Sequence, residues 1–558
     1  MAESDKASKV TIPEEVGKKQ LAEGMASSTT IEKGIPSRAA AAMVAAGILL
    51  SRIAGLIRDR VFAHFFGNSE AADAFRAALR IPNFLQNLFG EGVLSASLIP
   101  VYARLRAEGK DEEASQVAEA IFVLLALTTA VLVAVGMIAT PWLIDAIAPG
   151  FHGGRRELTI QLVRILFPGV GLLVLCAWCL GILNSHRKFF LSYASPVIWN
   201  LAIIGAFYVR GTHGESYRLA GIVAWGAVVG SVLQFAVQLP VVLRFLRPPT
   251  LRWQASRHVR TVVRNFFPVF VARGVAQISA YVDQLLASFL PIGAVAALSY
   301  AQTIYMLPVS LFGMSVSAAE LPAMSSELGS TEEIAHALRD RLARGLEQIS
   351  YFVVPSAVAF LLLGNVVVAT IYLSGAFGAG DVIYVWGTLA GSAVGLLAST
   401  SGRLYSSTFY ALRDTRTPLK FACIRVVLTL GLGYALALPL PPRLGLERRW
   451  GVVGLTISAG IAAWIEFLLL RRSMRKRIGR VPLSSTRLLK LYAAAILGSV
   501  AAILLYQFGL RHVAFFTRPV IRGVLELGTY GLLYLVFSYW LGISTVGSAL
   551  RTLQRGRR

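Results

Sequence analysis

The sequence predicts an all-α polytopic membrane protein with about fourteen transmembrane helices, because runs of about 20 apolar residues recur along the whole chain. Composition supports this class. Hydrophobic residues make up 55% of the 558 positions and charged residues only 15%, and the mean hydropathy is +0.63. Water-soluble domains carry about 25% charged residues. Most of the chain is therefore expected to lie in lipid.

The apolar runs place the helices in order along the chain. Their approximate spans are 39–66, 71–101, 116–145, 158–184, 191–209, 219–243, 265–290, 294–322, 346–372, 382–410, 417–440, 451–470, 488–508 and 523–542. The preceding residues 1–37 are polar and lack the apolar core of a signal peptide. We therefore predict that they form a disordered cytoplasmic tail.

The formal net charge of +24 would suit a nucleic-acid partner only if the basic residues shared one soluble face. Instead they alternate from loop to loop. With the N-terminus in the cytoplasm, about 35 Lys and Arg fall inside and about 10 outside, as the positive-inside rule requires. This predicts a multi-pass protein with both termini cytoplasmic, attraction of the basic loops to anionic membrane lipids, and no nucleic-acid partner.

An internal repeat relates the first two helices to the seventh and eighth. Asp59, Ala63 and Phe65 recur as Asp283, Ala287 and Phe289, and Leu88-Phe89-Gly90 recurs as Leu311-Phe312-Gly313. An offset of six helices gives both copies the same orientation. We predict an N-lobe at 38–245, a C-lobe at 246–470, a cavity between them, and an appended helix pair with a basic tail at 471–558.

Charged residues gather in the first two helices, among side chains that belong in lipid. They are Arg52, Arg58, Asp59, Asp73, Arg76, Arg80 and Glu91. Each ionised group in a membrane costs about 3 kcal/mol or more unless it faces a wet cavity and has a partner. The cluster is therefore a candidate substrate-binding site. The alternative is that these groups are snorkelling ends and internal salt bridges that only hold two helices together.

Helical spacing indicates which charges share a face. Asp73, Arg76 and Arg80 form one ladder, in which Asp73 is predicted to orient both arginines. Arg52 aligns with Asp59, whereas Arg58 points elsewhere around the same helix. The first helix would then offer cations on two faces.

Fewer charges mark the second half of the predicted bundle. Arg273 precedes Asp283 by ten residues, close to three helical turns, so both could point into the cavity. We add Arg273 to the predicted substrate-binding residues, and take Asp59 and Asp283 as candidate ion-binding or gating positions. Gln234 and Gln238 in the sixth helix could line the bundle interior or make ordinary interhelical hydrogen bonds.

No cofactor or metal is expected. The three cysteines lack the exposed, electropositive setting of a reactive thiol, and the histidines are scattered singly.

Short motifs in this order and spacing resemble the MurJ (MviN) family of lipid II flippases, in the multidrug/oligosaccharidyl-lipid/polysaccharide exporter superfamily. They include Ser51-Arg52, Arg58-Asp59, Asp73-Ala74-Phe75, Pro82-Asn83, Glu91-Gly92, Ala148-Pro149-Gly150-Phe151, Gly181-Ile182-Leu183-Asn184, Gln238-Leu239-Pro240 and Asp414-Thr415-Arg416-Thr417-Pro418. The resemblance implies fourteen helices, alternating access to a cationic cavity, a groove for the polyprenyl tail beside the last helix pair, and a place in the bacterial cytoplasmic membrane. It implies lipid-linked peptidoglycan precursor as substrate and the cell-wall synthesis machinery as a candidate partner.

The chain departs from the family pattern at positions where the family usually has arginine. Here Gln86, Asn87 and Thr303 stand instead, and we expect Arg76 and Arg273 to supply the missing charge. A sodium site that some relatives form around an Asp matching Asp283 is not expected, because the eleventh helix has Arg425 and lacks the polar partners.

Three functions follow from these observations. The sequence favours a flippase for the polyprenyl-diphosphate-linked precursor, since arginine forks suit phosphate oxygens. A divergent relative that exports another polyprenyl-linked glycan or an amphipathic compound is the alternative. A membrane enzyme is disfavoured, because no paired carboxylates or nucleophile motif accompany the short loops.

Overall fold

The computed structural model describes residues 37–210, 216–247, 257–325, 330–482, 484–510 and 512–543. Within them the secondary structure is helical, apart from an isolated bridge between Ser374 and Phe377. The first part of the chain forms α2 (Ser37–Phe66), α3 (Glu70–Phe89), α4 (Glu91–Ala107), α5 (Asp111–Ile147), α6 (Gly153–Ser185), α7 (Phe189–Ala194), α8 (Pro196–Arg210), α9 (Ser216–Leu243) and α10 (Arg257–Ser288).

The second part begins with α11 (Ala294–Pro308), which continues through the π-helical η1 (Val309–Met314) into α12 (Ser315–Ser325). The remaining elements are α13 (Thr331–Leu362), α14 (Gly364–Tyr372), α15 (Ala379–Ala411), α16 (Arg416–Ala437), α17 (Leu440–Arg443), η2 (Arg448–Trp450), α18 (Gly451–Ile478), α19 (Ser485–Leu505), η3 (Tyr506–Leu510), η4 (Ala514–Thr517) and α20 (Pro519–Trp540).

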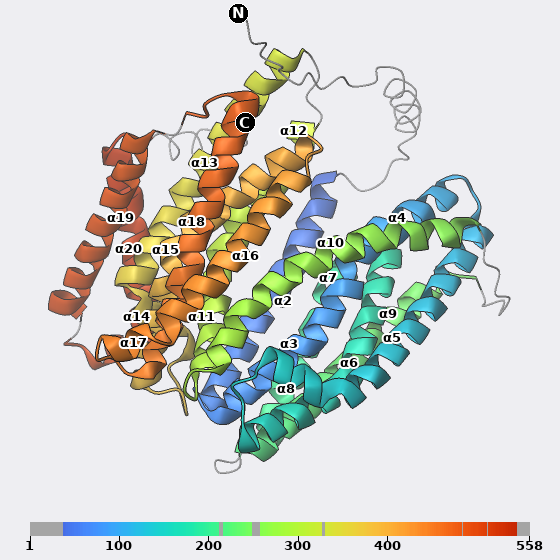
Figure 1. The fold of residues 1–558 in the computed structure, drawn as a ribbon, viewed down its shortest axis with the longest axis horizontal. Coiled ribbons are helices and arrows are strands. Elements are labelled where there is room, and N and C mark those ends of the chain that lie inside the picture. The colour runs from blue at the N-terminus through green and yellow to red at the C-terminus, as the bar shows by residue number, and fades with distance from the viewer. Residues whose placement is uncertain are drawn as a thin grey trace, which may run out of the picture.

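The predicted fold class is confirmed. Eleven segments in the described residues are long and apolar enough to cross a membrane. The other three of the predicted fourteen are α2, α3 with α4, and α10, which run through the same bundle (Figure 1). These three carry the charged residues that the sequence singled out. The charged residues of these three helices lower their mean hydropathy. The same residues form the candidate site.

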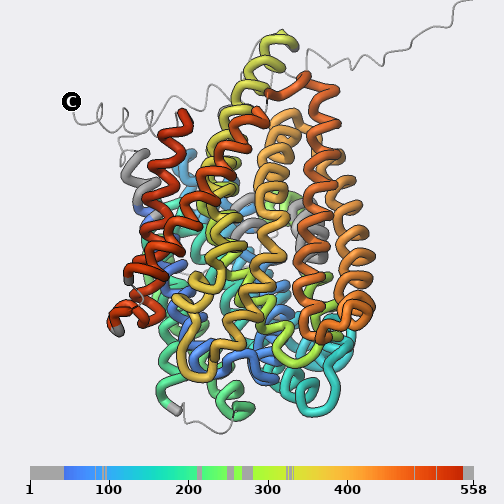
Figure 2. Tube along the Cα trace, turned by 90° about the vertical axis from the view of Figure 1, so that its left-hand side faces the viewer, coloured from blue at the N-terminus to red at the C-terminus, as the bar shows by residue number. Residues whose placement is uncertain are grey.

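The helices form two groups side by side. Figure 1 shows α2 to α9 on one side and α11 to α18 on the other, with α10 crossing obliquely from the second group to the first. Helices α19 and α20 lie at the outer edge of the second group, as the second view also shows (Figure 2). The outward surfaces are apolar, for example at Leu127, Ile138 and Trp142 of α5, as a surface that meets lipid requires.

Both copies of the repeated motif coincide with an irregular helix. The first copy ends α3 at Gly90, where a Cβ atom would lie 2.1 Å from the carbonyl oxygen of Gln86. The second copy contains Gly313, which lies in η1, and there a Cβ atom would lie 2.2 Å from Thr400. Each glycine therefore permits a close approach at the break.

The two ends of the bundle differ in packing. We call the end that holds the turns 67–69, 148–152, 289–293 and 373–378 the closed end. The opposite end, with loops 107–111, 185–188, 412–415 and 479–482, is the basic end. One buried apolar cluster extends from α2 and α3 through α11 to α15 and joins both helix groups. A separate cluster, which includes Leu98, Tyr102 and Trp178, serves the first group near the basic end.

Candidate functional site: a polar cavity above a closed end

Contacts between the two helix groups seal the closed end. Tyr300 donates a hydrogen bond from its hydroxyl to the carbonyl of Gly67 at 2.9 Å. Arg60 donates to the carbonyls of Thr370 and Ile371 at 2.7 and 2.8 Å. Because these bonds join segments more than 200 residues apart in sequence, they must break if the two groups separate here.

Asp73 lies at the centre of this seal. Its carboxylate is fully buried and accepts hydrogen bonds from the backbone amides of Gly293 at 2.7 Å and Ala296 at 2.8 Å. These amides belong to the N-terminus of α11, where free N–H groups favour a negative charge. Arg155 lies 3.4 Å away on the other side. The predicted pairing of Asp73 with Arg76 is therefore wrong, and Asp73 holds the closed end instead.

We expect Asp73→Asn to loosen the closed end by about 2–4 kcal/mol, because an amide offers one acceptor oxygen for two amides and no charge for Arg155. The measurement is the rate at which a membrane-impermeant maleimide modifies a cysteine placed at the buried Ala71, in protein carrying Cys423→Ser.

The matched control is Asp145→Asn, which breaks the ion pair with Arg156 on the exposed surface of the same end. Such exposed pairs contribute little. Equal labelling of Asp73→Asn and the control would show that Asp73 does not hold the seal.

A polar cavity of about 630 Å³ lies between the helix groups, from the level of Asp59 toward the basic end. Helices α2, α3, α8, α9 and α11 supply its polar wall. The polar lining residues are Ser51, Arg52, Arg58, Asp59, Asn83, Gln86, Asn87, Asn200, Gln234, Ser299, Gln302 and Thr303. Among the described side chains, three of the lining residues are charged, and two of those are arginines.

Both predicted arginines of the first helix face this cavity. Arg52 is exposed, and within the described residues no carboxylate lies at ion-pair distance from it. Arg58 keeps 21% of its side chain exposed, bonds to Asp59 at 3.0 Å, and lies 5.2 Å from the ring of Trp199. The cavity extends round α2, so side chains on two faces of the helix reach the same space.

Asp59 forms the floor of the cavity. Besides Arg58, it accepts hydrogen bonds from Arg76 at 3.2 Å and from the hydroxyl of Thr303 at 3.2 Å. Arg76 stacks over the ring of Phe62 at 4.3 Å and lies 5.1 Å from that of Tyr300. It does not line the cavity, so its charge serves to neutralise Asp59 and to join α2, α3 and α11.

The other predicted residues lie around this floor. Arg80 donates to the amide oxygen of Gln302 at 2.8 Å, and Gln302 lines the cavity. Asp283 lies outside the cavity lining, with one buried carboxylate oxygen that has no hydrogen-bond partner in the described part of the chain. The side chains of Glu91 and Arg273 lie outside the described residues, so the proposed roles of both stay predictions.

Gln86, Asn87 and Thr303, where this chain departs from the family pattern of arginines, line the cavity. The cavity is accordingly less cationic than arginine there would make it. The predicted replacement by Arg76 does not occur in this conformation, because Arg76 is turned toward Asp59.

Sequence reasoning missed the contribution of α8, whose Trp199 and Asn200 line the cavity. It left two roles open for the glutamines of α9, and the structure assigns one role to each. Gln234 lines the cavity, whereas Gln238 is buried and donates to Ser195. The sequence shows these residues as polar side chains within apolar helices. It does not show whether such a side chain contacts the cavity or a neighbouring helix.

A polar, cationic cavity inside a helical bundle, sealed at one end by breakable contacts, defines a membrane transporter for an anionic or polar solute. Comparisons narrow this class. The family model described as lipid II flippase MurJ matches residues 62–522. The chain belongs to this family of lipid flippases, as its sequence motifs predict, and is accordingly a multi-pass transporter of the bacterial inner membrane.

Relatives and solved structures agree. A lipid II flippase MurJ of Burkholderia cenocepacia is 33% identical over 436 residues, which cover 77% of this chain and 82% of the relative. A probable lipid II flippase MurJ of Rhizobium tropici is 29% identical over 535 residues, covering 92% and 96%. A structure of lipid II flippase MurJ in an inward closed conformation matches with TM-score 0.72 at 25% identity, covering 90% of this chain and 99% of that one. An inward-facing MATE transporter, 17% identical with TM-score 0.59, covers 76% and 95% and shares the fold.

Proposed function

We propose that this protein translocates lipid II, the peptidoglycan precursor linked to undecaprenyl through a diphosphate, across the cytoplasmic membrane. The observation that supports this most directly is the pair of arginines in the cavity. Within the described residues, Asp59 is the one carboxylate that lines the cavity, and Arg76 neutralises it from the side away from the cavity. The charges of Arg52 and Arg58 are thus left for a substrate, and guanidinium forks match phosphate oxygens.

The orientation in the membrane follows from the loops. The basic end carries Arg104, Arg106, Lys110, Arg187, Lys188, Arg413 and Arg416, and loops rich in Lys and Arg face the cytoplasm. Both chain termini are then cytoplasmic. In this orientation the cavity reaches toward the cytoplasm, where the precursor is made, and the closed end faces outward.

Transport would proceed by alternating access between an N-lobe at 38–245 and a C-lobe at 246–470. Outward opening requires the seal at Asp73, Tyr300 and Arg60 to break. The floor formed by Asp59, Arg76 and Thr303 joins both lobes and would separate in the same step. No covalent chemistry is needed, because the cavity only shields the headgroup from lipid.

A second candidate is a divergent family member that moves another polyprenyl-linked glycan or an amphipathic compound. The lining at Gln86, Asn87 and Thr303 favours it, since uncharged side chains there suit a less anionic headgroup.

Relocating a cation within the cavity tests the proposal. Arg52→Ala should reduce growth of a strain depleted of its own lipid II flippase, and adding Gln86→Arg should restore part of it, because both positions line the same cavity. The readout is colony formation at equal protein level. A matched control adds Gln161→Arg, at an exposed position of α6 outside the cavity lining; rescue by that change as well would show that cavity charge is not what matters.

A further inference from the structure

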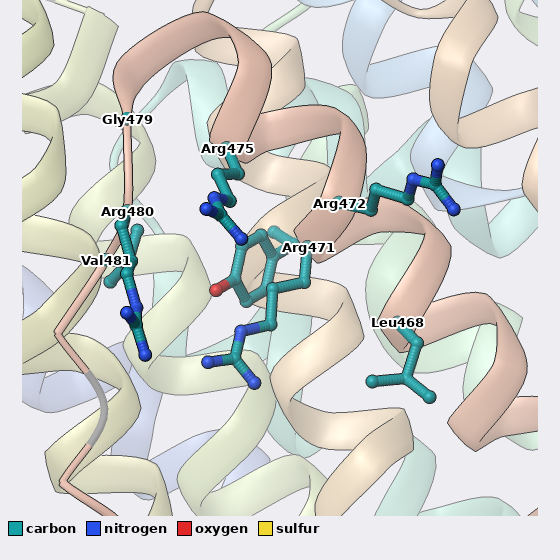
Figure 3. A pocket seen from close by; sticks show the side chains of 8 residues that line it. Leu468, Arg471, Arg472, Arg475, Gly479, Arg480 and Val481 are labelled. Carbon is teal, nitrogen blue, oxygen red and sulfur yellow. The ribbon is translucent and has the colours of Figure 1, made fainter.

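A second cationic pocket, of about 300 Å³, lies at the basic end. Residues between 405 and 481 line it, whereas residues between 51 and 307 line the central cavity. The last turns of α18 and the start of its linker to α19 supply most of its wall, and Tyr405 of α15 supplies the rest. Figure 3 shows the guanidinium groups of Arg471, Arg475 and Arg480 directed toward one space, while that of Arg472 points away. Arg471 and Arg475 are four residues apart and so share a helix face.

These three arginines lack the partners that their neighbours have. Arg477 on the same helix pairs with Asp414 and lies 5.5 Å from the ring of Phe409. Arg487 at the start of α19 pairs with Glu347 at 2.6 Å. Within the described residues, no acidic side chain lines the pocket, and none of the three pocket arginines is bonded to a carboxylate. Their charge is therefore available to an anion.

A buried hydroxyl gives an independent indication of a ligand. Tyr405 is fully buried, yet its hydroxyl has no hydrogen-bond partner in the described part of the chain. An unmet polar group in such a place is costly. Because Tyr405 lines the same pocket as the three arginines, an acceptor oxygen bound there would satisfy all four side chains.

The residues that follow α18, Gly479 to Val481, form one wall of this pocket. Gly479 ends α18 with a φ of +85°, a backbone conformation that favours glycine. The next residue, Arg480, is thereby turned back toward Arg471 and Arg475 (Figure 3). Val481 follows and is buried, which anchors the linker against the bundle.

A smaller pocket of about 120 Å³, with an apolar wall, adjoins this one. Its lining is mixed: Leu346, Leu397, Phe467 and Leu488 form an apolar wall, and Ser350, Ser401 and Ser485 contribute hydroxyl groups. Arg471 lines both pockets, so a molecule with a phosphate in the first could place a hydrocarbon chain in the second. A free inorganic anion would use only the first.

We propose that these adjoining pockets bind a lipid of net negative charge through its phosphate group, with Arg471, Arg475, Arg480 and the hydroxyl of Tyr405 on the phosphate oxygens. The site lies between the second helix group and the terminal pair α19–α20, in the leaflet at the basic end. It goes beyond the transport proposed above, because Arg52 and Arg58 take no part in it. The phosphate could come from an anionic phospholipid or from a polyprenyl phosphate compound.

The test is native mass spectrometry of the purified full-length protein with four probes: dioctanoyl phosphatidylglycerol, dioctanoyl phosphatidylcholine, geranylgeranyl diphosphate and sodium phosphate. We expect Arg471→Gln with Arg475→Gln to weaken phosphatidylglycerol binding about ten-fold or more, since two charge-assisted bonds are lost. Tyr405→Phe, which removes only the hydroxyl, should weaken it about three-fold or more.

Lys476→Gln is the matched control, because Lys476 is an exposed cation on the same helix end and does not line the pocket. It should bind as the wild type does, and all variants should keep their melting temperature. Preference for geranylgeranyl diphosphate, lost in the same variants, would support the site and assign it to the substrate's lipid class. Undiminished phosphatidylglycerol binding in both pocket variants would overturn the proposal. So would equal binding of phosphatidylcholine, or sodium phosphate binding as tightly as the lipids.

Discussion

Replacing Arg58 with alanine is expected to abolish growth of a cell that depends on this protein, at normal protein level. Arg58 is a cation of the cavity wall that remains partly exposed and is already held in place by Asp59 and Trp199. A preorganised guanidinium loses little freedom on binding a phosphate. Losing a charge-assisted, two-pronged contact costs about 2–4 kcal/mol, or roughly 30- to 1,000-fold in affinity.

Two further variants separate charge from geometry. Arg58→Lys keeps the charge but loses the planar fork, so partial activity is expected. Arg104→Ala removes an exposed arginine paired with Glu108 at the basic end and should have no effect. Full growth of Arg58→Ala would remove Arg58 from the substrate site.

The largest effect on stability is expected for Asp59→Asn. The change leaves Arg76 without its counter-charge, and the side chain of Arg76 is only 9% exposed. An uncompensated buried charge costs about 3–5 kcal/mol. A lower melting temperature of the purified protein is the expected result.

The companion variant Arg76→Met, combined with Asp59→Asn, should recover much of that loss, because replacing a buried pair by neutral groups is often close to neutral. The melting temperatures of the two single variants and the double variant form a cycle that isolates the coupling. Additive losses would show that Asp59 and Arg76 do not act as a pair.

The helices could be predicted because they depend on local information. A run of apolar residues reports lipid contact wherever it occurs, and charges in α2 and α3 marked the cavity because their cost in lipid is large. Arg52 and Arg58 were found in this way. The irregular helices at Gly90 and Gly313 were visible as a repeated motif, although not as breaks.

The partners of each charge could not be predicted in the same way. Helical spacing places Arg76 near Asp73, but the backbone amides that donate to Asp73 are 220 and 223 residues away, at the start of α11. Likewise, nothing local distinguishes Arg58, which faces the cavity, from Arg76, which is enclosed by Phe62 and Tyr300. The packing of the two helix groups against each other determines which partner each charged side chain contacts.

We propose that the cavity at Arg52 and Arg58 carries the lipid-linked precursor across the membrane. The most direct measurement is translocation of fluorescent lipid II in proteoliposomes, read by the fraction that a membrane-impermeant quencher reaches over time. We expect the wild-type protein to accelerate translocation, and Arg52→Ala with Arg58→Ala to reduce the rate to that of protein-free vesicles. Translocation by the double variant at the wild-type rate would show that neither arginine is needed to carry the precursor.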